Sequence, residues 1–194
     1  MSEDSPNIPN YLQPDWTIGP GFPPEKYDPD LEREIEAYVS WQTIRQQFGN
    51  VIVEFQLLES VLKDAISHLL NPHDYTFGRI VTASMQFGQI LGVLYALFHY
   101  KNFGNDNLES LKKVLRKCLD CTQKRNEMVH SYWTPNEDGL GLRLRIKRSN
   151  IGRPYETEKI TITPETLEAD VAFYEATRKE LNDLFVRLFP EFRS

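Results

Sequence analysis

The octet from Arg125 to Tyr132 reads Arg-Asn-Glu-Met-Val-His-Ser-Tyr, and it gathers a guanidinium, an amide and an imidazole near the end of an amphipathic segment. Packing alone explains this octet poorly, because Arg125 falls where the helical period asks for an apolar residue. His130 follows five positions later. We therefore expect the octet to carry chemistry and the chain to be mainly helical.

The placement of Arg125 leaves more than one interpretation open. On a helical wheel Arg125 lies within about 40° of the apolar stripe, His130 lies at its edge, and Asn126 lies between them. A guanidinium in that stripe is costly unless it is paired or faces a polar cleft. Two alternatives need no function: a side chain that reaches water past its own stem, or an ion pair with Glu54 or Glu59 of an earlier helix.

The octet resembles the motif of the HEPN family, R-x4–6-H, in which a polar residue commonly follows the arginine. Arg125, Asn126, His130 and Tyr132 match its R-N-x-x-x-H-x-Y form. The match includes the setting, which is the end of a helix in an expected all-helical bundle. The resemblance covers roughly residues 31–133 and the last helix, and the rest of the chain looks like additions.

The resemblance implies a homodimer that brings two motifs into one cleft, and metal-independent cleavage of RNA without a cofactor, often as a toxin or antiviral effector in the cytoplasm. It implies that His130 acts on the ribose 2′-OH or the leaving oxygen, that Arg125 holds the scissile phosphate, and that Asn126 orients either group. Tyr132 matches the tyrosine that is modified in toxin members paired with a nucleotidyltransferase antitoxin. A packing or hydrogen-bonding tyrosine is the alternative for Tyr132.

A basic segment follows the octet. Alternating residues after position 139 predict a strand, and residues 159–163 predict a return strand, so we expect a hairpin at about 140–163. Its cations could track an RNA backbone, or they could form an ordinary solvated strand face that protects a sheet edge. The candidate RNA-binding residues are Arg143, Arg145, Lys147, Arg148 and Arg153.

The surrounding periodicity predicts a mainly α fold, an antiparallel four- to five-helix bundle with a small β-hairpin insertion before the last helix. Residues 1–29 form a proline-rich acidic arm, and residues 30–194 form the helical domain. The expected helices start at Asp30 as N-cap, break or kink at Gly49-Asn50, and continue to about residue 70. Further helices are expected over 77–100, 107–133 and, after Thr163 and Pro164, to about 189.

Composition bounds the remaining classes. The net charge is −6, but residues 1–36 hold nine acidic and two basic side chains, so the acidity does not exclude a nucleic-acid partner. We expect Cys118 and Cys121 to be buried packing residues in a reducing cytoplasm. No histidine has metal-ligand spacing, so no metal site is expected. The uncharged run 80–100 contains polar residues, which favours a buried helix over a membrane span.

Three functions remain open from the sequence. The first is a HEPN-type endoribonuclease in a bacterial defence or toxin–antitoxin setting. The second is a HEPN-like binding or assembly module that lacks catalysis. The third is a helical interaction protein in which Arg125 is a structural ion pair. The first requires Arg125 and His130 to share an exposed cleft, whereas the third predicts that Arg125 contacts Glu54 or Glu59.

Overall fold

The computed structural model describes residues 29–137, 139–147 and 156–192, and this part confirms a mainly helical bundle with a small antiparallel sheet before the last helix. Residues 1–28 of the expected arm lie outside the described residues. The helices are α1 (Pro29–Leu70), α2 (Thr76–Thr82), α3 (Phe87–Lys101), α4 (Asn105–Val129) and α5 (Pro164–Leu188). The strands are β1 (Tyr132–Pro135), β2 (Gly141–Lys147) and β3 (Glu156–Ile162).

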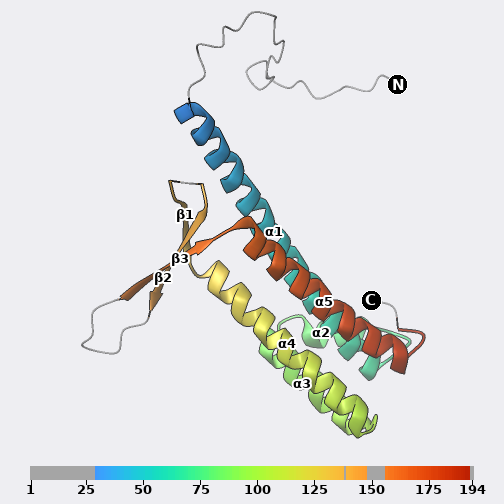
Figure 1. Cartoon of the computed structure of the whole chain (residues 1–194). Coiled ribbons are helices and arrows are strands. Elements are labelled where there is room, and N and C mark those ends of the chain that lie inside the picture. The colour runs from blue at the N-terminus through green and yellow to red at the C-terminus, as the bar shows by residue number, and fades with distance from the viewer. Residues whose placement is uncertain (1–28, 138, 148–155, 193–194) are drawn as a thin grey trace, which may run out of the picture.

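The long helices pack side by side along α1 (Figure 1). α1, α3 and α5 run in one direction and α4 runs against them, so the end of α4 points back toward the first half of α1. That half projects past the other helices, and the sheet lies beside it (Figure 1). The end of α4 therefore meets α1 and the sheet in one region, and this is where the octet lies.

α1 runs without interruption over 42 residues, so the expected break at Gly49-Asn50 is wrong. Ile44, Val51 and Leu58 recur every seven residues and are almost fully buried, which holds the helix through the weak point. Asn50 donates its side-chain amide to Gln47 at 3.1 Å. The start of α1 also differs from the expectation, because Asp30 lies in the first turn rather than at the cap.

The expected helix over 77–100 is two helices, α2 and α3, which part at residues 83–86. Gln86 begins α3 through a capping box: its backbone N–H donates to the side chain of Gln89 at 2.8 Å. Three small residues at four-residue spacing, Ser84, Gly88 and Gly92, are exposed, and no described atom lies within 4 Å of a Cβ built at either glycine.

α4 ends at Val129, four residues before the expected Trp133. Side chains beyond the end satisfy its last carbonyls: the Ser131 hydroxyl donates to Glu127 O, and Trp133 Nε1 donates to Met128 O at 2.8 Å. The chain then enters β1, an additional strand that pairs with β2 from Tyr132↔Leu144 onward. β2 and β3 pair antiparallel, as the hairpin prediction required.

α5 begins as predicted. Thr163 Oγ1 accepts the backbone N–H of Thr166 at 3.3 Å, and Pro164 is the first helical residue. None of the described helices combines the length and apolar content that crossing a bilayer requires. The core that holds the helices together includes Phe55, Leu62, Ile66, Ile90, Leu94, Phe98, Leu111, Cys118, Leu167, Tyr174, Leu181 and Phe185.

The far end of the bundle is closed around His68. This histidine is buried near the end of α1, and its Nδ1 lies 3.0 Å from Tyr75 Oη. Its Nε2 lies 3.5 Å from a carboxylate oxygen of Glu191, beyond the end of α5. The rings of Phe189 and Phe192 lie against the imidazole. Burial lowers the pKa of His68, opposed by the Glu191 carboxylate.

Candidate functional site

Arg125 lies on an aromatic platform built by three other helices. Its guanidinium carbon is 5.5 Å from the ring centroid of Phe55, which is nearly buried in α1. Phe87 at the start of α3 stacks on Phe55 with ring centroids 4.7 Å apart. Tyr174 of α5 meets Phe55 edge-on and donates its hydroxyl to Cys121 O at 2.8 Å. The platform therefore fixes where the Arg125 side chain can lie.

The charge of Arg125 is not neutralised within the described part of the chain. Its Nη1 donates to Asn126 Oδ1 at 3.0 Å, and the described residues give it no carboxylate partner. Glu54 instead accepts from Arg178 of α5 at 3.2 Å, and Glu59 pairs with Lys63 at 2.6 Å. Thus the two acids that the sequence offered to Arg125 bind other cations, and the expected structural ion pair is not found.

Three other side chains of the octet, those of Asn126, His130 and Tyr132, face solvent. Asn126 and His130 are exposed, and His130 is the C-cap of α4, with its backbone N–H donating to Asn126 O at 3.0 Å. Tyr132 begins β1 and is 70% exposed. The structure therefore brings Arg125 and Asn126 into contact and places His130 about one turn further along, at the same helix end.

Glu127, inside the octet, binds the arginines of β2. Its carboxylate lies 3.4 Å from Arg143 Nη2 and 3.3 Å from Arg145 Nη1. Arg143 is only 8% exposed, and its Nε has no hydrogen-bond partner among the described residues. The expectation of a solvent-facing basic strand is thus wrong at Arg143, because this face of β2 turns toward α4. Arg145 remains exposed but shares the same carboxylate.

Three further basic candidates lie wholly or partly outside the described residues. The side chain of Lys147 and the whole of Arg148 and Arg153 lie outside the described residues. Across the β2–β3 register, Arg145 stands opposite Glu158. Arg143 and Arg145 therefore lie beside acidic neighbours rather than forming a continuous basic surface.

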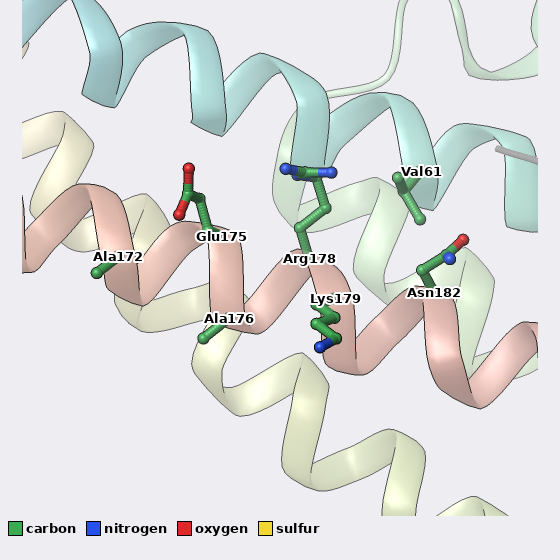
Figure 2. A pocket seen from close by; sticks show the side chains of 7 residues that line it. All are labelled: Val61, Ala172, Glu175, Ala176, Arg178, Lys179 and Asn182. Carbon is green, nitrogen blue, oxygen red and sulfur yellow. The ribbon is translucent and has the colours of Figure 1, made fainter.

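A hollow lies between α1 and α5, with a volume of about 580 Å³. Figure 2 shows Arg178 turned toward α1, where it binds Glu54. The residues that line the hollow are Val61, Ala172, Glu175, Ala176, Arg178, Lys179 and Asn182. None of these described residues belongs to the octet, so the hollow is separate from the candidate site.

Both cysteines are buried in the core, as predicted. Burial raises the pKa of Cys121 to about 11, and burial also raises the pKa of Cys118. Both thiols therefore stay protonated near neutral pH and pack as small apolar groups. Among the described residues, no cluster of three His, Cys, Asp or Glu side chains could hold a metal ion.

Comparison of the chain with models of protein families, with curated proteins and with solved structures gives no match. The sequence predicted the positions of Arg125 and His130, but not the contacts around them: Phe55 lies under Arg125, Glu127 binds the β2 arginines, and Trp133 bonds the last turn of α4. A detectable signal existed for Phe55, since Trp41, Phe48 and Phe55 recur every seven residues on one face of α1.

Proposed function

We propose that this protein is a metal-independent endoribonuclease that acts as a homodimer, in a toxin–antitoxin or antiviral setting. The observation that carries the proposal is the arrangement of side chains at the end of α4. There Arg125 has a guanidinium without a described carboxylate partner, and Asn126 and His130 are exposed beside it. A phosphate oxygen would meet a cation whose charge is still available, and a histidine able to move protons would lie within the same turn or two.

The proposed reaction uses the substrate's own nucleophile. The ribose 2′-OH attacks the adjacent phosphorus, the bond to the 5′ oxygen breaks, and the products are a 2′,3′-cyclic phosphate and a 5′ hydroxyl. His130 takes the proton from the 2′-OH or gives one to the leaving oxygen. Arg125 offsets the charge on the phosphate oxygens, and Asn126 orients the phosphate or the imidazole. In a dimer, His130 of each protomer could serve one of the two proton transfers.

An apolar row on α1 supports the dimer. Leu31, Ile35 and Val39 are each more than half exposed and follow one another at four-residue spacing. Exposed apolar side chains in a continuous row are typical of surfaces that bind another protein. A second copy of the chain is the partner that the proposal requires at this row, which lies on the projecting half of the helix that also carries the aromatic platform.

The test is cleavage of single-stranded RNA by the full chain in excess chelator. We expect His130→Ala and Arg125→Ala each to lower the rate by at least about 100-fold, with dimer content unchanged. His99→Ala and Arg116→Ala are matched controls, because both residues are exposed, one at the end of α3 and the other in α4. Products ending in cyclic phosphate would identify the attacking group.

A second function is favoured by one observation, the neutralised arginines of β2. Because Glu127 binds Arg143 and Arg145, the sheet offers RNA less free charge than its sequence indicates. A binding or assembly module without catalysis would show this arrangement. RNA that stays intact with wild-type protein, across sequences and structures, would reject the nuclease and favour this second function.

A further inference from the structure

A small aromatic pocket lies where the first half of α1 meets the beginning of the sheet. Its volume is about 230 Å³, and it is open to solvent. Trp133 forms one wall, held by its hydrogen bond to Met128 O and by an edge-on contact with Phe48 at 5.4 Å. We call it the aromatic pocket, and its lining residues are Trp41, Ile44, Arg45, Phe48 and Trp133.

Two connections tie the aromatic pocket to the octet. Trp133 comes three residues after His130 and bonds the last turn of α4. On α1, Trp41, Phe48 and Phe55 share one face at seven-residue spacing, so Phe48 lies about 10 Å along the helix from Phe55. Because Arg125 lies on Phe55, the same aromatic row leads from the pocket to the guanidinium.

The chemistry of the pocket selects the kind of ligand. Two indoles and a phenyl ring supply flat apolar walls, and all three side chains are half-buried, so part of each ring faces solvent. Among the described residues that line the pocket, Arg45 carries the charge; it is exposed, and its Nη1 lies 3.5 Å from the Gln42 side-chain oxygen. A cation would be repelled by Arg45, whereas a flat uncharged ring attached to an anion satisfies both the walls and the guanidinium.

We propose that the aromatic pocket binds a nucleobase of single-stranded RNA, next to the phosphate held by Arg125. This inference rests on the proposed function and adds a substrate requirement to it. The base stacks on the exposed faces of Trp41 and Trp133, and Arg45 faces the phosphate attached to that nucleotide. Only an unpaired base can enter, since a base within a duplex has both faces covered by its neighbours.

Binding is measured by fluorescence anisotropy of a labelled single-stranded oligoribonucleotide on the full-length His130→Ala chain, which should not cleave it. Adding Trp41→Ala to this chain should weaken binding about ten-fold, and Trp41→Phe should restore most of it. Tyr100→Ala is the matched aromatic control, because Tyr100 is exposed at the end of α3. An oligonucleotide with abasic positions tests the base directly. It should bind the His130→Ala chain about as weakly as the intact oligonucleotide binds the chain that carries both His130→Ala and Trp41→Ala.

Cleavage by the chain with His130 intact separates this inference from the proposed function. Trp41→Ala should raise KM more than it lowers kcat. Cleavage that depends on His130 but ignores Trp41→Ala and abasic substitution would overturn the pocket and leave the nuclease standing. Binding that depends on the base, without cleavage, would support the pocket and overturn the nuclease. Binding of a proline-rich peptide through Trp41, with no binding of RNA, would assign the pocket to a protein partner and overturn the proposal.

Discussion

Arg125 and Arg143 both lie near the end of α4, but they have different partners and therefore different roles. Arg143 is buried against Glu127, so its charge serves the fold. Arg125 lies on an aromatic ring and bonds the Asn126 amide, and no carboxylate of the described residues pairs with it, so we expect its charge to be open to a ligand. The distinction depends on Glu127, which is in the same octet as Arg125 and His130 and takes up both described arginines of β2.

Replacing Glu127 with glutamine should therefore destabilise the protein. The change removes the charge that faces the buried Arg143, and we expect the free energy of unfolding to fall by about 2 kcal/mol. Glu59→Gln is the control, because Glu59 pairs with Lys63 on the partly exposed surface of α1, and its loss should cost under ~0.5 kcal/mol. Urea denaturation of both variants measures the difference. Equal losses would show that Glu127 does not hold the strand arginines.

At this scale the sequence predicted the positions of side chains better than their partners. Helical periodicity places Arg125 on the apolar side of α4, and the structure agrees, because that property depends on one helix. The platform beneath it uses Phe55, Phe87 and Tyr174 from three other helices. Alternation likewise puts Arg143 and Arg145 on one strand face, yet it does not say which face turns inward.

α1 is the element on which both candidate binding features depend. It carries Phe55 under Arg125, four of the five residues that line the aromatic pocket, and the exposed apolar row. Because it is continuous through Gly49, these features keep a fixed spacing along one rod. Gly49 is exposed, and a Cβ built there meets no described atom within 4 Å.

Gly49→Ala should therefore stabilise the protein by about 0.5–1 kcal/mol, since alanine loses less backbone entropy in a helix interior. Thermal or chemical unfolding measures the change. Gly139→Ala gives the opposite expectation, because Gly139 has φ +73° and a Cβ there would lie 2.1 Å from Ala37 O. A loss of stability in Gly49→Ala would indicate that α1 bends at this position in solution.

Element boundaries were predictable where a standard cap marks them. Thr163-Pro164 gave the start of α5 correctly, because the threonine hydroxyl and the proline φ angle act locally. The start of α3 at Gln86 and the end of α4 before β1 were missed. Glutamine is an uncommon cap, and the end of α4 depends on an indole and on the pairing of β1 with β2, whose partners lie six to twelve residues apart.

At the end of the bundle opposite the octet, His68 of α1 contacts the segment that follows α5. Burial lowers the pKa of His68, although Glu191 opposes this and His73 adds to it. The unfolded chain therefore binds a proton more readily than the folded one. The stability that neutral His68 contributes is present above its unfolded pKa of about 6.5, and it is lost as pH falls below that value.

Acidification from pH 7.5 to 5.5 should accordingly lower the free energy of unfolding more in the wild type than in His68→Gln, which keeps a polar group near Tyr75. Denaturation at several pH values gives both curves, and their difference isolates His68 from the other titrating groups. His99→Gln, at an exposed position, should follow the wild-type curve. Parallel curves for wild type and His68→Gln would mean that the buried histidine does not couple folding to pH.

The parallel packing of α1 and α5 has a consequence for synthesis of the chain. Gln47 bonds Glu168 and Glu54 bonds Arg178, contacts that join residues 121 and 124 positions apart. The ribosome therefore completes α1 long before the helix that covers it exists. Until α5 has been made, the apolar stripe of α1 can be covered only by α2, α3 and α4 or by chaperones. The last helix therefore completes a core that the first one began.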